Sequence, residues 1–124
     1  MLNQNDNVTG NGRFALILTA PILPGKTEAW RRFVQEMSEL RRHEYEASRR
    51  QLRIVSEWLW LAAVGGRETV IIAVIAAHPE RILAEIAVSE RPFDLWYRQQ
   101  LVHLLGVELP SVPPVELGWS WQRR

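Results

Sequence analysis

Apolar residues in this chain follow two kinds of spacing, which predict two kinds of element. Three short continuous apolar runs are bounded by glycine, proline or polar residues, and such runs are typical of buried strands. They cover residues 14–20, 53–63 and 69–77. Gly65 and Gly66 separate the second run from the third and predict a hairpin with its loop at residues 64–68. Residues 115–122 alternate between polar and apolar side chains and predict a last strand at an edge of the sheet.

Stripes of apolar residues with a spacing of three or four predict three helices. The first is predicted as one continuous helix from Thr27 to about Arg50, with Thr27 as its cap. The second begins at Pro79, since proline favours the first position of a helix. The third covers residues 92–105, and Gly106 is predicted to end it.

The order of these elements predicts the fold class. A strand, a helix, two strands, two helices and a strand form the βαββαβ arrangement of a ferredoxin-like α+β protein. Its antiparallel sheet carries helices on one face only. We expect a single domain of this kind over residues 13–124, after a frayed tail at residues 1–12.

The two central strands predict that a second molecule covers the sheet. Residues 53–63 and 69–77 are apolar at almost every position, so each face of the sheet needs a cover. The chain supplies one helical layer, which covers one face. Two copies packed sheet to sheet would bury the other face, and we therefore expect a homodimer. An apolar face left open to water would promote aggregation.

Three segments carry a resemblance to known proteins. Residues 22–30 (ILPGKTEAW) follow the first strand and resemble the first strand–helix junction of the dimeric α+β barrel superfamily, which includes antibiotic-biosynthesis-monooxygenase-like domains. Residues 42–50 (RHEYEASRR) and 92–98 (PFDLWYR) are similar to a bacterial domain family of unknown function with the same fold. The resemblance covers about residues 13–122 and implies the barrel and the dimer. It leaves the activity open, because the superfamily includes monooxygenases, isomerases, haem-handling proteins and simple binding proteins.

Composition narrows the function classes. The 124 residues include 15 basic and 14 acidic residues, a net charge of +1, so we expect no nucleic acid and no membrane surface as a partner. Cysteine is absent, which excludes disulfides and thiolate catalysis. No apolar run reaches the roughly 18 residues of a membrane span and the start does not resemble a signal peptide, so we expect a cytoplasmic protein. His43, His78 and His103 lie on separate predicted elements without zinc-site spacing, and neither a metal nor a cofactor is expected.

Glu57 is the acidic residue that stands out, because it interrupts an apolar row on one face of its predicted strand. The other members of that row are Val55, Leu59 and Leu61. A carboxylate in such a row must be paired, hydrogen-bonded or protonated, and Arg49 or Arg50 of the long helix is the expected partner. A buried or interfacial ion pair is the simpler interpretation. A general base or a ligand anchor is the functional one, which makes Glu57 the catalytic candidate.

Aromatic residues suggest a ligand site. The chain has six tryptophans, and Trp58 and Trp60 are expected on the strand face opposite Glu57. With Trp121 and aromatic side chains from the helices, they would wall a cavity of at least about 300 Å³ for a flat apolar molecule. The candidate ligand-binding residues are Tyr45, Arg49, Glu57, Trp58, Trp60, Trp96 and Trp119. Packing in the core and in a dimer interface would explain the same aromatic content.

Three functions remain open at this point, and the sequence does not decide whether the protein is an enzyme. The first is a homodimer that binds a small apolar or aromatic molecule without catalysis. The second is a cofactor-independent monooxygenase or isomerase, with Glu57 or a histidine as the base and Trp60 and Trp96 as walls. The third is a purely structural or interaction domain.

Overall fold

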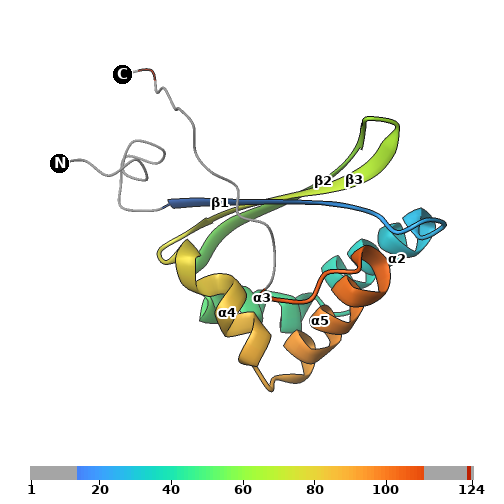
Figure 1. The fold of residues 1–124 in the computed structure, drawn as a ribbon. Coiled ribbons are helices and arrows are strands. Elements are labelled where there is room, and N and C mark those ends of the chain that lie inside the picture. The colour runs from blue at the N-terminus through green and yellow to red at the C-terminus, as the bar shows by residue number, and fades with distance from the viewer. Residues whose placement is uncertain (1–13, 111–122, 124) are drawn as a thin grey trace.

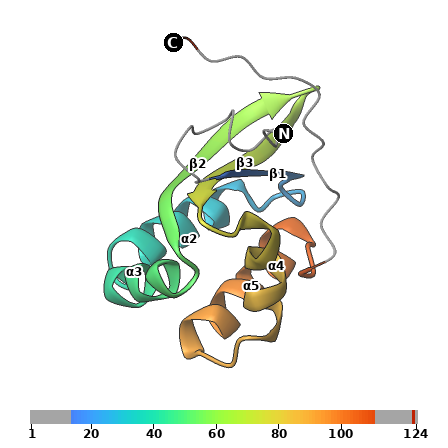
Figure 2. The same cartoon turned by 90° about the vertical axis from the view of Figure 1, so that its left-hand side faces the viewer.

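A sheet and a layer of helices make up the computed structural model, which describes residues 14–110 and residue 123. In chain order the elements are β1 (Phe14–Pro21), α2 (Thr27–Ser38), α3 (Arg42–Gln51), β2 (Ile54–Val64), β3 (Arg67–Ala76), α4 (Pro79–Val88) and α5 (Pro92–Leu105). The four helices lie on one side of the sheet (Figure 1). The same two layers are visible after a quarter turn (Figure 2). The predicted α+β class, with helices on one face of an antiparallel sheet, is confirmed for the described residues.

Several sequence predictions fall on residues that the structure does not describe. They are the tail at residues 1–12, the last strand at residues 115–122, and the two tryptophans Trp119 and Trp121.

The sheet has three antiparallel strands in the order β1-β3-β2 within the described residues. β2 and β3 meet at Gly65 and Gly66, whose φ angles are 59° and 80°. A two-residue hairpin turn with positive φ at each central position is the I′ type, and glycine adopts that conformation without steric cost. The loop is therefore shorter than the predicted residues 64–68, since Val64 and Arg67 already pair with each other.

A β-bulge near the start of β2 changes which residues face the helices. Ile54 pairs with Ala76 and Ser56 pairs with Ile75, so Val55 is an extra residue on β2. Side chains normally alternate between the two faces of a sheet, and one extra residue shifts this alternation by one position. Residues before the bulge therefore face the side opposite to the one that regular alternation predicts from the residues after it. Ile54 consequently shares the helix-facing side with Glu57. The prediction that Val55 lies on the face of Glu57 is wrong, and Val55 is 49% exposed.

The single long helix predicted from Thr27 is two helices. α2 ends and α3 begins on either side of Leu40, which is almost fully exposed. At the break, the backbone N–H of Arg41 donates to the carbonyl oxygen of Glu36 at 2.8 Å. This hydrogen bond joins residues five positions apart, whereas an α-helix joins residues four apart. No glycine or proline occurs there, so local propensity gives no sign of the break. Each helix then buries residues of its own, which are Trp30, Phe33 and Met37 in α2 and Ser48 and Arg49 in α3.

The start of α2 also differs from its prediction. Lys26, not Thr27, occupies the N-cap position, and no side chain caps the helix there. The hydroxyl of Thr27 instead donates to the carboxylate of Glu68 on β3. Thr27 therefore links the helix to the strand that carries the hairpin.

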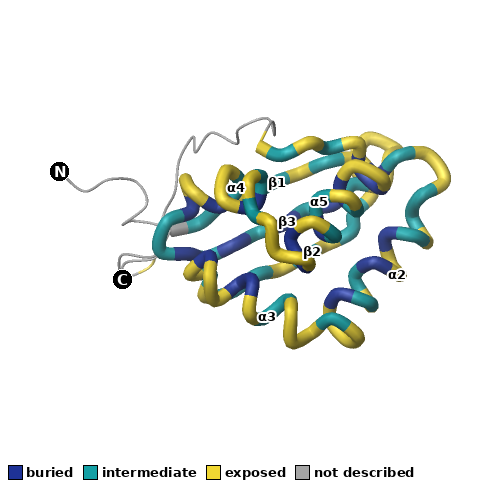
Figure 3. Tube along the Cα trace, turned by 90° about the horizontal axis from the view of Figure 1, so that it is seen from below, coloured by how far each residue is buried: buried dark blue, intermediate teal, exposed yellow. Residues whose placement is uncertain are grey.

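The core lies between the helices and one face of the sheet, and the central strand β3 contributes most of the sheet's share (Figure 3). Alternate residues of β3 are buried against the helices, namely Val70, Ile72, Val74 and Ala76. α5 has the bounds that its sequence pattern predicted, α4 begins at the predicted Pro79, and both helices therefore start at proline. Gly106 ends α5 in the left-handed conformation, with φ of 67°, which confirms the predicted cap.

Candidate functional site

A buried ion pair joins the helical layer to the sheet. Glu57 of β2 and Arg49 of α3 have side chains that are 4% and 7% exposed. The Nε of Arg49 donates to Oε1 of Glu57 at 2.9 Å, and the hydroxyl of Tyr45 donates to the same oxygen at 2.5 Å. The expected pairing of Glu57 with an arginine is thus confirmed, with Arg49 and not the exposed Arg50 as the partner. We call Tyr45, Arg49 and Glu57 the polar cluster.

Further hydrogen bonds connect the polar cluster to α5. Nη1 of Arg49 donates to Oγ of Ser48 at 3.1 Å, and that hydroxyl donates to Oδ1 of Asp94 at 2.9 Å. Oδ2 of Asp94 accepts from the hydroxyl of Ser89 at 2.5 Å. Asp94 lies in the first turn of α5, where the helix dipole favours a negative charge. The polar groups of two helices, one strand and the C-cap residue of α4 therefore form a continuous network.

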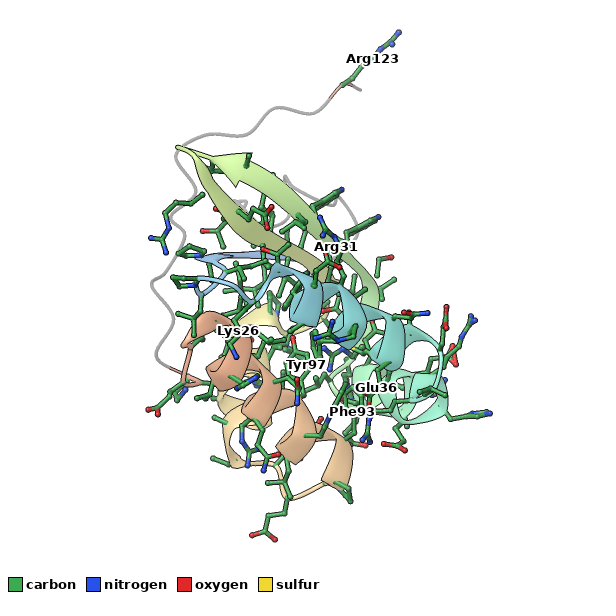
Figure 4. The ribbon with its side chains drawn as sticks, turned by 90° about the vertical axis from the view of Figure 1, so that its right-hand side faces the viewer. Lys26, Arg31, Glu36, Phe93, Tyr97 and Arg123 are labelled. Carbon is green, nitrogen blue, oxygen red and sulfur yellow. The ribbon has the colours of Figure 1, made fainter. Side chains whose placement is uncertain are left out.

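Aromatic rings surround the guanidinium of Arg49. Its central carbon lies 4.8 Å from the ring centroid of Tyr45, 4.8 Å from that of Tyr97 and 5.8 Å from that of Phe93. Phe93 and Tyr97 both come from α5 (Figure 4). The faces of aromatic rings attract a cation, and a planar guanidinium stacks on them. The rings thus supply part of the stabilisation that water would otherwise give to the buried charge.

The protonation states of the polar cluster follow from burial and charge. Burial raises the pKa of Tyr45 above its ordinary value, and the charge and the hydrogen bond of Glu57 raise it further. Burial likewise raises the pKa of Tyr97, partly opposed by the positive charge of Arg49. Burial alone would lower the pKa of Arg49, but the charge and hydrogen bond of Glu57, together with Tyr97 and Tyr45, raise that pKa overall. At neutral pH the two tyrosines are therefore protonated and Arg49 is a cation.

An apolar cavity begins at the polar cluster and extends between the sheet and helices α4 and α5. The charged groups in its wall are those of Arg49 and Glu57. Tyr97 also lines it, and most of the remaining wall is aliphatic, including Leu16, Leu18, Ile72, Ile82, Ile86 and Leu101. Its volume is about 40 Å³, which is room for about three water molecules. It is smaller than the expected pocket of about 300 Å³, and no tryptophan of the described residues lines it.

The structure separates the candidate ligand-binding residues into two groups. Tyr45, Arg49 and Glu57 lie together on the helix side of the sheet. Trp96 is on that side too, packed between Phe33 and Phe93, with centroid distances of 5.3 and 5.5 Å. Trp58 and Trp60 lie on the opposite face of the sheet, and Trp119 is outside the described residues. Within one molecule, the sheet prevents Trp58 and Trp60 from lining a cavity with the polar cluster.

Trp58 and Trp60 dominate the open face of the sheet. Their rings are nearly parallel, with an interplanar angle of 5° and a centroid distance of 6.4 Å. The side chains are 46% and 49% exposed. Ala73 of β3 and Ile17 of β1 continue the row of Trp58 across the sheet. The neighbouring positions of this face are apolar or carry hydroxyl groups, namely Ala15, Thr19, Ser56, Ala62, Thr69, Ile71 and Ile75.

Sequence reasoning misses three hydrogen-bonding members of the network, Ser48, Ser89 and Asp94, and the place of Tyr97 beside it. Asp94 was not singled out, although it precedes Tyr97 by three residues and Leu101 by seven and so falls on the apolar stripe of α5. That position was the available signal for a buried carboxylate. Ser48 has no sequence signal, because its partner is 46 residues away. Tyr97 falls on the apolar stripe of the helix predicted at residues 92–105, which favours a place in the core, and only the fold shows that its ring lies against Arg49.

The histidines do not join the site. His43 and His103 are exposed, and Nε2 of His103 lies 3.2 Å from Nζ of Lys26. His78 occupies the N-cap position of α4. Across residues 14–110, no three side chains of the metal-binding types come close enough to hold an ion. In the same range, every helix is too short or too polar to span a bilayer.

Comparison of the chain with protein-family models, with curated proteins and with solved structures finds no match in any of the three. The interpretation of the site therefore depends on its geometry and chemistry alone.

Proposed function

We propose that this protein is a homodimeric, ferredoxin-like α+β barrel that binds a small apolar or aromatic molecule. The observation that carries the binding function is the cavity beside the polar cluster. Its wall is mainly aliphatic, with its charges confined to Arg49 and Glu57. Ligand sites in proteins combine mostly apolar walls with a few polar groups that orient the ligand.

The open face of the sheet supports the dimer. Exposed Trp58, Trp60, Ile17, Val55 and Val64 gather on or beside this face. Together these side chains present on the order of 500 Å² of apolar surface, which is at the upper end of what monomers expose. A second copy, which presents the same mainly apolar face with Arg67 at its hairpin end, buries it by sheet-on-sheet packing, and stable interfaces bury about 800 Å² per partner.

Light scattering at micromolar concentration tests the dimer. The wild-type chain is expected to give twice its mass of 14.4 kDa. Trp58→Glu places a charge in the interface and is expected to give the mass of one chain. Val88→Glu is the matched control, because Val88 is an exposed apolar residue on α4, in the helical layer. A wild-type protein that remains a single chain would exclude the dimer.

Toluene tests whether the cavity, about 40 Å³ when empty, widens to admit an apolar molecule, with methyl resonances of the protein as the readout. We expect toluene to shift the methyl signals of Ile72 and Val74, which line the cavity. Ala20→Val adds two methyl groups to the same wall and is expected to weaken the shifts at least several-fold. Ala63→Val is the control, because this strand residue is exposed and does not line the cavity. The absence of any shift at saturating toluene would disprove the binding function.

Binding without catalysis is the function we prefer over a monooxygenase or isomerase. A general base must reach a proton of its substrate with a free lone pair. Oε1 of Glu57 already accepts hydrogen bonds from Tyr45 and Arg49, so only Oε2 is left to act as a base, and the ion pair with Arg49 gives this carboxylate a structural role that needs no catalysis. The described residues offer no histidine in the wall of the cavity as a second base.

A further inference from the structure

The two carboxylate oxygens of Glu57 have different surroundings. Oε1 accepts from Tyr45 and from Arg49, whereas Oε2 accepts no hydrogen bond from any described residue. Among the described residues, every fully enclosed side-chain nitrogen or oxygen has a hydrogen-bond partner, so Oε2 is not fully enclosed. The side chain is 4% exposed and lines the cavity. Glu57 lines the cavity, so the free side of this carboxylate is assigned to it.

From this asymmetry we infer that the cavity selects a small apolar molecule that carries one hydroxyl group, which donates to Oε2 of Glu57. The inference depends on the binding function proposed above and adds the chemical class of the ligand. A buried carboxylate oxygen that faces an apolar space gains more from a donor than a solvated oxygen does. The aliphatic wall then takes the apolar body of the ligand.

The neighbouring charges favour a neutral donor over other polar groups. Arg49 lies beside the carboxylate and repels an ammonium group. An anionic ligand would bring a second negative charge next to Glu57, and a ligand with only acceptor atoms would leave Oε2 without a partner. A hydroxyl group avoids each of these costs.

Phenol and toluene form a matched pair for the test, because they differ by one hydroxyl in place of a methyl group. We expect phenol to bind the wild-type protein at least about tenfold more tightly than toluene, since hydrogen bonds to charged groups are the stronger ones. In Glu57→Gln the preference is expected to fall to about threefold or less. Ala63→Val, at an exposed strand position that does not line the cavity, is the control that leaves the carboxylate in place, and it is expected to keep the preference.

A second measurement needs no variant and so stands even if Glu57→Gln fails to fold. The carboxyl carbon resonance of Glu57 in the wild-type protein is expected to shift on addition of phenol and to stay in place with toluene. Equal binding of the two probes with an unmoved carboxyl resonance would overturn the inference but leave the binding function intact. Absence of binding by either probe would overturn the binding function and this inference with it.

Discussion

Nε of Arg49 lies 2.9 Å from Oε1 of Glu57, and both side chains are almost completely buried. These residues are eight positions apart and belong to different elements, α3 and β2. The pair therefore fixes the position of a helix against the sheet and also forms one end of the apolar cavity.

Removal of one partner should be costly. Arg49→Met leaves the carboxylate of Glu57 buried without its cation and is expected to lower the free energy of unfolding by about 3–5 kcal/mol. Arg42→Met is the control, since Arg42 and Glu46 form an exposed pair at 3.9 Å, and its loss should cost less than about 0.5 kcal/mol. Urea denaturation measures both. A loss below about 1 kcal/mol in Arg49→Met would contradict the prediction.

The double variant Arg49→Met/Glu57→Leu separates the charge effect from packing. It removes both charges, so no unpaired charge remains in the core. We expect the double variant to be more stable than Arg49→Met alone. Its loss of unfolding free energy should be smaller, by at least about 1 kcal/mol, than the sum of the losses in Arg49→Met and Glu57→Leu. Strict additivity in urea denaturation would show that the two side chains contribute independently.

Stability should fall at alkaline pH because of the two tyrosines, Tyr45 and Tyr97, which are the only ones in the chain. The pKa of each is raised in the folded state, from an ordinary value of 10.0. The folded protein therefore holds these protons where the unfolded chain releases them. The contribution to stability is complete below pH 10 and decreases as pH rises further, by up to about 1.4 kcal/mol per pH unit for each tyrosine.

Ultraviolet titration of tyrosine ionisation checks this prediction directly. Both tyrosines are expected to ionise well above pH 10 in the native protein and near pH 10 in urea. Tyr45→Phe should remove half of the native signal and reduce the slope of stability against pH. Native ionisation near pH 10 would show that the hydroxyl groups are not held as described.

The hairpin should tolerate only residues that accept a left-handed backbone. Gly66→Ala is expected to lower the free energy of unfolding by about 1–2 kcal/mol. A Cβ atom at either glycine has no neighbour within 4 Å, so the cost is conformational and not a clash. Gly65→Asn is the control, because Asn-Gly is a favoured pair in I′ turns, and its thermal midpoint should stay close to that of the wild type. A neutral Gly66→Ala would mean that the turn has another conformation.

Arg53 should be a position where glycine stabilises the protein. Its φ is 57°, and it lies between α3 and β2 where glycine is the usual residue. Arg53→Gly is expected to raise the free energy of unfolding by about 0.5–1 kcal/mol. Arg50→Gly, inside the neighbouring helix α3, should have the opposite sign, with a loss of about 1 kcal/mol. A change of the same sign in both variants would contradict the left-handed backbone conformation of Arg53.

Local patterns predicted the elements well because each pattern reports a short-range property. The bounds of α5 follow from Pro92 and Gly106, which set the first helical φ and the left-handed cap. The glycine pair between β2 and β3 likewise fixed the hairpin. Glu57 was identified as a buried carboxylate because it interrupts an apolar row, which is visible within eight residues.

The missing parts of the site depend on contacts between distant segments. The bulge at Val55 reverses the alternation of β2, and it is defined only by how β2 pairs with β3. The break between α2 and α3 near Leu40 contains no glycine or proline, so the local sequence does not predict it. Asp94 becomes part of the network only because α5 packs against α3 and brings it to Ser48.

Short-range patterns in the sequence were enough to predict the three described strands, the helix at residues 92–105, the hairpin and the need of Glu57 for a partner, since periodicity and backbone preference act over a few residues. Tertiary packing alone selected Arg49 as the partner, brought Glu57 to the wall of a small aliphatic cavity, and put Trp58 and Trp60 on the other face of the sheet. The physical reason is that strand register and helix packing choose which distant side chains meet, and these choices depend on the whole core at once.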